Sequence, residues 1–224
     1  MARQGTNRDR HLSMEQTSAT PVPVAFVVMM ATLMSVAAVS IDAMLPALGQ
    51  IGVDLGSANA NQPQLILSAV FAGMAVGQLI AGPVSDAVGR KPLLLWCLLV
   101  YLLGAVVCLF ANNMGTMLLG RVVQGLGAAG PVVSCISIVR DKFHGREMAK
   151  VMSLVMMIFI MAPVLAPALG QGLMLVAHWR IIFGFFVLYG VAVGAWVLMS
   201  LEETLPLAKR IPWRITTILQ AAKE

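Results

Sequence analysis

Charge is scarce in this sequence. Only 11% of its 224 residues are Asp, Glu, Lys or Arg, while 59% are hydrophobic. An ordinary soluble domain is about 25% charged and about 45 to 50% apolar. No soluble core of this size absorbs so much apolar surface, so the composition excludes an ordinary soluble domain. It predicts an integral membrane protein.

Residues of common catalytic and metal sites are scarce as well. The three cysteines lie in apolar runs without a CxxC pair, so neither a disulfide framework nor a zinc site is expected. The three histidines lie in tails or loops, and the sequence has neither an HExxH motif nor a P-loop. The sequence therefore predicts neither an enzyme nor a bound metal or nucleotide.

What the sequence has is long apolar runs. A bilayer core of about 30 Å is crossed by about 20 mainly apolar residues in a helix. Six runs of that length predict six transmembrane helices at residues 24–48, 65–84, 92–111, 116–139, 149–176 and 181–201. The segments between them are short, as expected for antiparallel neighbours.

The basic residues predict how these helices are oriented. Most of them fall on one side of the predicted spans, whereas only Arg180 falls on the other. They are Arg3, Arg8, Arg10, Arg90, Lys91, Arg140, Lys142, Arg146, Lys150, Lys209, Arg210, Arg214 and Lys223. By the positive-inside rule both termini are expected to be cytoplasmic. The net charge of +5 is thereby explained by membrane orientation, and no nucleic-acid partner is expected.

Two segments allow more than one interpretation. The first apolar run follows basic residues, as a signal peptide does, but it is long, contains Asp42 and precedes five further runs, which favours a retained helix. The tail after residue 205 is basic with interleaved apolar residues. It is either an amphipathic helix at the membrane surface or a plain linker, and the two are compatible.

Two ionisable residues fall inside predicted spans, Asp42 in the first and Arg121 in the fourth. Such a residue costs at least about 2.5 to 3.5 kcal/mol near the bilayer centre, so each is expected to face a partner, water or the bundle interior. Their similar depth allows them to meet. Asp42 either exchanges a proton or binds a cationic substrate, or it is a static partner of Arg121 or a helix cap. Arg121 holds polar contacts in a cavity or is purely structural.

Glycine and proline recur at helical spacing. Gly73 and Gly77 lie four residues apart, the small-xxx-small spacing that lets helices approach closely. Pro163 and Pro167 also lie four apart, and Gly170 follows them. Each proline removes a backbone donor, so the fifth helix is expected to be bent. It is either a hinge or seam, or simply a kinked structural helix.

Four sequence motifs resemble those of a known transporter family. They are GQLIAGPVSDAVGRKP between the second and third runs, LLGRVVQGLGAAG in the fourth, MAPVLAPALGQG in the fifth and IDAMLPAL in the first. RDKFHGREMAKVMS also resembles the family's loop between helices four and five. Together they resemble the N-terminal half of a major facilitator superfamily transporter, most closely the Bcr/CflA-type drug:proton antiporters. Ala87 and Gln171 depart from the usual motifs.

The resemblance implies a domain plan and a function. Residues 1–21 would be a cytoplasmic tail, 22–205 a six-helix bundle and 206–224 the start of a central cytoplasmic loop. The activity implied is proton-coupled efflux of drug-like small molecules across the bacterial inner membrane, with the proton gradient as energy source and no cofactor. The chain alone is expected not to transport, and to need a C-terminal half or a second copy. The alternatives are a carrier of sugars, amino acids or other metabolites, and a non-transporting scaffold.

The resemblance also implies roles for three sets of residues. The coupling residues would be Asp42, Arg121 and Gln124. The conformational latch would be Gly82, Asp86, Gly89, Arg90, Lys91 and Asp141. The packing and hinge residues would be Gly73, Gly77, Gly125, Pro163, Pro167 and Gly170. Within the latch, Gly82 is expected to sit in close helix contact, Gly89 to form the turn, and Arg90 to reach Asp86 or Asp141.

Overall fold

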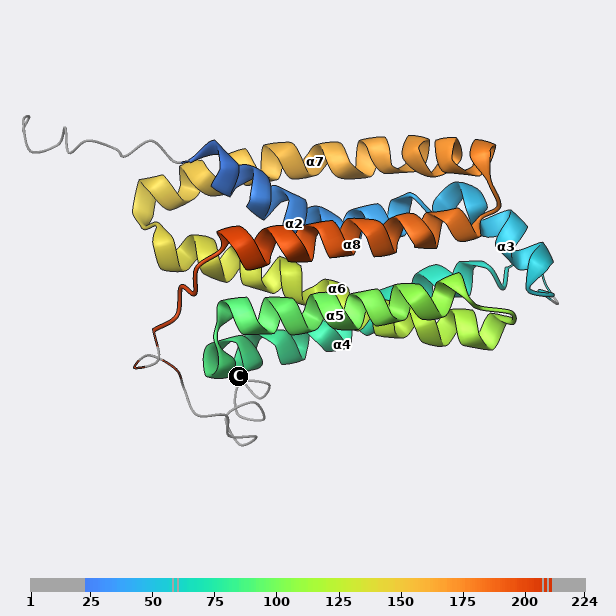
Figure 1. Ribbon diagram of the computed structural model, residues 1–224, viewed down its shortest axis with the longest axis horizontal. Helices are drawn as coiled ribbons and strands as arrows, with labels where there is room; N and C mark the ends of the chain where they lie inside the picture. Colours follow the sequence, from blue (N-terminus) through green and yellow to red (C-terminus); the bar gives the residue numbers. More distant parts are fainter. Residues whose placement is uncertain (1–22, 58, 60, 207, 209, 211–224) are drawn as a thin grey trace, which may run out of the picture.

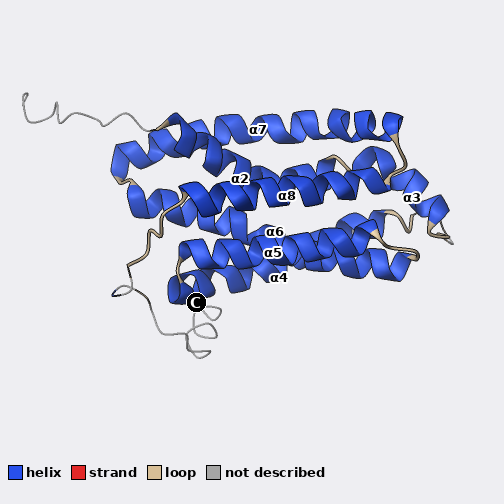
Figure 2. Ribbon diagram, viewed as in Figure 1, coloured by secondary structure: helices blue, strands red, loops and turns tan. Residues whose placement is uncertain are grey.

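The computed structural model describes residues 23–57, 59, 61–206, 208 and 210, and every regular element among them is helical (Figure 2). The elements are α2 (Val24–Asp42), η1 (Leu45–Ala47), α3 (Leu48–Asp54), α4 (Gln64–Val88), α5 (Arg90–Leu109), α6 (Met114–Lys142), α7 (Gly145–Val176) and α8 (Arg180–Ser200). The predicted N-terminal tail, and almost all of the segment after residue 206, lie outside the described residues.

Six helical segments are long and apolar enough to cross a membrane, which confirms the predicted number of spans. The first span is composite, because α2, η1 and α3 follow one another from Val24 to Asp54. The prediction ended this span at residue 48. Pro46, which lacks a backbone N–H, lies in the 3-10 turn at the break, and a further helical piece follows it. Several helices also extend past the apolar runs, since hydropathy marks only the part that lies in hydrocarbon.

The helices run side by side along the long axis of the molecule (Figure 1). α6 packs extensively against both α4 and α5, α2 packs on α7 and α6, and α8 packs on α5. The α4–α5 turn, the α6–α7 turn and the end of α8 share one end of the bundle (Figure 1), which we call the basic end. It carries Arg90, Lys91, Arg140 and Lys142.

Glycines allow α4 and α6 to pack backbone against backbone. A Cβ atom on Gly73 would overlap the carbonyl oxygen of Val122, and one on Gly125 would overlap that of Val70. Gly77 likewise lies against the backbone of Leu126. Small residues at such positions let transmembrane helices make close van der Waals contact, which is a main source of helix association in lipid.

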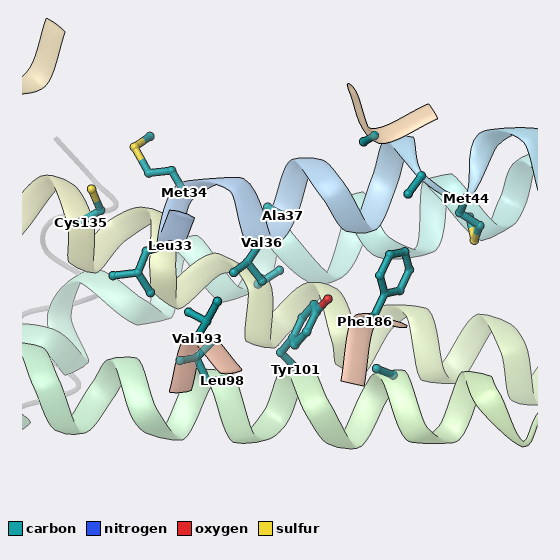
Figure 3. Packing of buried hydrophobic residues seen from close by; sticks show 14 of the residues in the cluster. Leu33, Met34, Val36, Ala37, Met44, Leu98, Tyr101, Cys135, Phe186 and Val193 are labelled. Atoms are coloured by element: carbon teal, nitrogen blue, oxygen red, sulfur yellow. The ribbon is translucent and has the colours of Figure 1, made fainter. Parts of the chain in front are cut away.

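The apolar core lies between α2, α5, α6 and α8. Figure 3 shows Leu33 and Val36 of α2 above Leu98 and Tyr101 of α5, with Val193 of α8 beside them. All five side chains are buried. The core therefore joins the two sides of the bundle through its central helices. α7 contributes only a few side chains to it, among them Val151 and Val155.

α7 is one unbroken helix from Gly145 to Val176 that contains both Pro163 and Pro167. The prolines therefore do not interrupt it. Gly170 brings it against the end of α2, because a Cβ there would overlap the carbonyl oxygen of Ala43. Many of its other apolar side chains are exposed, including Val164 and Leu165.

The end opposite the basic end is held by a smaller polar cluster. Trp179 Nε1 donates a hydrogen bond of 2.7 Å to Asp54 Oδ2, and His178 Nε2 lies 2.5 Å from the same oxygen. Arg180 stacks 4.4 Å from the Trp179 ring and donates to the carbonyl oxygen of Ala111. These contacts tie the α7–α8 turn to α3 and to the α5–α6 turn.

Candidate functional site

Asp42 is the last residue of α2 and lines an open pocket of about 350 Å³. The walls of the pocket come from α2, α4, α6 and α7. Its lining residues are Met34, Ala37, Ala38, Ile41, Asp42, Phe71, Met74, Gln78, Val132 and Phe159. Asp42 is the only charged residue among them. The pocket is therefore an apolar, aromatic and methionine-rich wall that contains one carboxylate.

The carboxylate of Asp42 has no partner within the described part of the chain. It makes neither a hydrogen bond nor an ion pair there, and its side chain is partly exposed. A carboxylate on a largely apolar wall is costly unless it meets water, a proton or a cation. Asp42 is thus free to take up either a proton or a positively charged group.

Arg121 of α6 is completely buried and does not pair with Asp42. Its guanidinium donates to Gln124 Oε1 at 2.7 Å and to the carbonyl oxygen of Ser40 at 3.1 Å. It also lies 5.9 Å from the centroid of the Phe183 ring. The possible ion pair between Asp42 and Arg121 is therefore not formed.

The failed pairing has a geometric reason. Successive residues of an α-helix are about 100° apart, so Ser40 and Asp42 project roughly 200° from each other around α2. Ser40 is buried and faces α5 and α6, whereas Asp42 lines the open pocket. Arg121 reaches α2 at Ser40, two residues before Asp42, so the two charges lie at a similar level but on opposite sides of α2.

Two neutral residues complete the network around Arg121, and the sequence analysis missed both. The hydroxyls of Ser40 and Tyr101 lie 2.7 Å apart, and Ser40 Oγ also donates to the carbonyl oxygen of Val36. Ser40 and Tyr101 are both fully buried. A signal for them existed, since hydroxyl groups within apolar spans need hydrogen-bond partners. The network links α2, α5 and α6 around a buried cation.

The network leaves two buried donors unused. Within the described residues, neither Nε of Arg121 nor Nε2 of Gln124 has a hydrogen-bond partner. No carboxylate lies within ion-pair distance of Arg121 in that part of the chain. Within the described residues, the groups that contact this charge are therefore uncharged: the Ser40 carbonyl, the Gln124 amide and the Phe183 ring.

At the basic end, Arg90 joins three helices. Its guanidinium donates to Asp86 Oδ1 at 2.6 Å, to Asp141 Oδ2 at 3.0 Å and to Ser85 Oγ at 2.7 Å. Arg90 is 4% exposed and is the first residue of α5, where the helix dipole disfavours a positive charge. The two carboxylates offset that cost. Arg90 thus reaches both of the carboxylates that the sequence placed near it.

Gly89 forms the turn before Arg90, with φ at +114°, in a region of backbone space that other residues rarely adopt. Gly82 does not behave as predicted. A Cβ at Gly82 would meet no atom within 4 Å, so it is not a close-contact position within the described residues. The reason is that α4 continues as a helix to Val88, with this side turned away from its neighbours.

Glu203 extends this cluster and was not found from the sequence. Its carboxylate accepts from the backbone N–H of Arg90 at 3.0 Å and of Lys91 at 3.3 Å, which caps the start of α5. In return, Lys91 Nζ donates to the carbonyl oxygen of Leu198 near the end of α8. Glu203 and Arg90 are 113 residues apart in the chain, so no short sequence motif contains both of them. The segment after α8 is thereby fixed to the α4–α5 turn.

The structure has six helical segments of membrane-spanning length, and a charged turn joins the second and third of them, so the fold is that of a multi-pass membrane protein. The chain belongs to the Major Facilitator Superfamily, whose sequence profile matches residues 23–217. This confirms the resemblance drawn from the four motifs.

Relatives of known name support the family. The chain is 39% identical over 180 residues to the MFS-type transporter YdgK of Bacillus subtilis (strain 168), covering 80% of this chain and 44% of that protein. It is 37% identical over 168 residues to the multidrug resistance protein MdtL of Escherichia coli O81 (strain ED1a), covering 75% and 43%. The chain thus spans less than half the length of these relatives.

Solved structures share the fold at low sequence identity. The human organic anion transporter MFSD10 (TETRAN) superposes with a TM-score of 0.70 and 19% identity, over 90% of this chain and 53% of that one. A peptide transporter POT in complex with sulfate gives a TM-score of 0.70 and 16% identity, over 88% and 42%. This likeness concerns the fold alone.

Proposed function

We propose that this chain is the N-terminal half of a proton-coupled exporter of small, lipophilic organic molecules in a bacterial inner membrane. The observation that carries the proposal is the Asp42 pocket, an apolar wall with one unpartnered carboxylate. Its methionine and aromatic lining adapts to apolar molecules of different shapes. The similarity of the chain to the multidrug resistance protein MdtL supports a drug-like cargo.

The coupling step follows from the position of Asp42. A protonated Asp42 is neutral and suits an apolar wall, whereas an ionised Asp42 attracts a cationic group. Proton and cation therefore compete for one carboxylate, so a proton that enters releases the cargo. Exchange of this kind is antiport. No metal or organic cofactor takes part in this step.

Arg121 and Gln124 have a supporting role in this scheme. Because Arg121 donates to the backbone of Ser40 and not to Asp42, it fixes the end of α2 from the buried side. It is thus a positioning residue for the carboxylate. The Arg90 cluster is proposed as the latch that holds the basic end together when the opposite end opens, with Glu203 as an additional member.

The second wall of the cargo site is proposed to come from another six-helix bundle. In transporters built from two repeats, the site lies between them and access alternates as one bundle rocks against the other. Pocket residues that are open to one side in this chain fit that arrangement. The partner is the C-terminal half or a second copy.

Binding of a lipophilic cation to the purified chain tests the proposal. Tetraphenylphosphonium is expected to bind more tightly as the pH rises, because the ionised carboxylate is the binding form, and to release protons when it binds. Asp42→Asn is expected to abolish the proton release and the pH dependence. Glu147→Gln is the matched control, because Glu147 is exposed in the first turn of α7 and lies outside the pocket. Equal proton release from Asp42→Asn and the unaltered chain would refute the proposal.

A further inference from the structure

A second pocket lies at the basic end, between the start of α2, the end of α6 and the end of α8. Its volume is about 300 Å³, and its main walls are Phe26, Met29, Lys142, Phe143 and Trp196. It shares no residue with the Asp42 pocket. The three helix ends that form it lie together in Figure 1, at the end where the span-forming helices stop.

Among the described residues, the pocket lining contains one cation and no anion. Lys142 is the charged residue of this lining, and its Nζ lies 5.2 Å from the centroid of the Phe26 ring. No carboxylate lies within ion-pair distance of Lys142 in the described part of the chain, and the adjacent Asp141 is bound to Arg90. The C-terminal carbonyls of α6 favour a cation here but supply no discrete negative charge.

The floor beneath Lys142 is aromatic and apolar. The Phe26 and Phe143 rings lie 5.7 Å apart, and Met29 is buried behind them. Trp196 forms the α8 side of the pocket and is only partly buried. Tryptophan and lysine at the end of a membrane span are typical of the level at which headgroups lie.

We propose that this pocket binds the headgroup of an anionic phospholipid. Its phosphate would meet Lys142, while its glycerol and upper acyl region would lie on the aromatic floor. A soluble anion would contact only Lys142, and an apolar molecule would contact only the aromatic floor, whereas a phospholipid contacts both. The volume is at the lower limit for a ligand pocket, which fits a headgroup rather than a whole lipid. A lipid held there bridges α2, α6 and α8.

Exposed basic residues near the pocket add to its attraction for negative charge. Arg140 and Arg146 flank Lys142 in the chain, and both are exposed. Basic pockets between transmembrane helices are a recurring form of lipid recognition. The acidic residue nearest in sequence that is not engaged by Arg90 is Glu147, which lies outside the pocket lining. The proposal is independent of what the transporter carries.

The test is lipid binding by the purified chain in a neutral detergent, measured by native mass spectrometry. Phosphatidylglycerol is expected to bind about fivefold more tightly than phosphatidylcholine, which is the effect of one basic residue near an anionic headgroup. Lys142→Gln is expected to remove this preference, and Lys142→Arg is expected to keep it. Lys150→Gln is the matched control, because Lys150 is exposed on α7 outside the pocket.

Three results would overturn the proposal. The two lipids bind equally to the unaltered chain, or Lys150→Gln removes the preference as fully as Lys142→Gln, or inorganic phosphate displaces phosphatidylglycerol at millimolar concentration. The second result indicates diffuse surface attraction, and the third a site for soluble anions. The comparison of the two lipids needs no variant, so equal binding of the two lipids overturns the proposal even if a substitution prevents folding.

Discussion

α6 and α7 follow one another in the chain and have similar lengths, yet they are packed in opposite ways. Fifteen of the 29 residues of α6 are buried, but only four of the 32 residues of α7. α6 packs against both α4 and α5 and also contacts α2, whereas α7 packs mainly on α2. The helix that carries the buried arginine is thus the most enclosed, and the proline-rich helix is among the least.

The difference follows from what each helix carries. A buried guanidinium needs hydrogen-bond acceptors on several sides, and only a helix enclosed by others supplies them. Glycines at Gly120, Gly125 and Gly127 let the neighbours approach α6 closely enough to do so. α7 is apolar on nearly all sides, which suits contact with lipid or with another bundle. α6 therefore holds its polar side chains among neighbouring helices, whereas α7 exposes most of its apolar side chains.

The largest expected effect separates the glycines of these two helices. Gly125→Ala in α6 should lower the free energy of unfolding by about 1 to 3 kcal/mol or more, because the new Cβ overlaps the backbone of α4 and cannot be relieved by a rotamer change. Gly172→Ala in α7 is the matched control, since a Cβ there meets nothing within 4 Å. Thermal or denaturant unfolding of the purified chain in detergent measures both.

The sign of this result is informative. Alanine is a better helix former than glycine by about 1 kcal/mol, so helix propensity alone predicts that both substitutions stabilise the protein. Only the packing of α6 against α4 reverses the sign at Gly125. If both variants were equally stable or equally unstable, α6 would not be enclosed as described.

Much of this arrangement could be predicted from the sequence. The lengths of the apolar runs predicted the six spans, since a helix that crosses the hydrocarbon core requires about 20 apolar residues whichever helices pack beside it. The four-residue spacing of Gly73 and Gly77 marked the side of α4 that meets α6. The contact of Arg90 with Asp141 could be predicted because both residues fall at the same end of consecutive spans.

The rest depends on rotation and on distant partners. Counting residues predicted that Asp42 and Arg121 lie at a similar level, but it does not give the rotation of α2 about its axis. Arg121 contacts Ser40, and two residues further along the helix Asp42 projects from the other side. Glu203, which caps α5, and Tyr101, which contacts Ser40, act across more than 60 residues of chain. Gly82 matched a motif but has open space in this bundle. Motifs identify residues, while their contacts follow from packing.

A second, smaller effect is expected where the Arg90 cluster meets α6. The side chain of Asp141 is 21% exposed and that of Asp86 is 45% exposed, although both bind Arg90. Asp141→Asn should therefore lower the free energy of unfolding by about 1 to 2 kcal/mol, and Asp86→Asn by less than about 1 kcal/mol. Denaturant unfolding of both variants checks the order. The reverse order would show that Arg90 is held mainly through α4 rather than through α6.

The smallest effect is expected on the outer surface of α7, where it bears on what covers that helix. Leu165 is 57% exposed and Val155 is fully buried. Leu165→Ala should change the free energy of unfolding in detergent by less than about 0.5 kcal/mol, whereas Val155→Ala should cost about 1 to 3 kcal/mol although it removes less hydrocarbon. If Leu165→Ala cost as much as Val155→Ala, this surface would be packed against protein in the purified sample. A second copy would then take the place proposed for the other bundle.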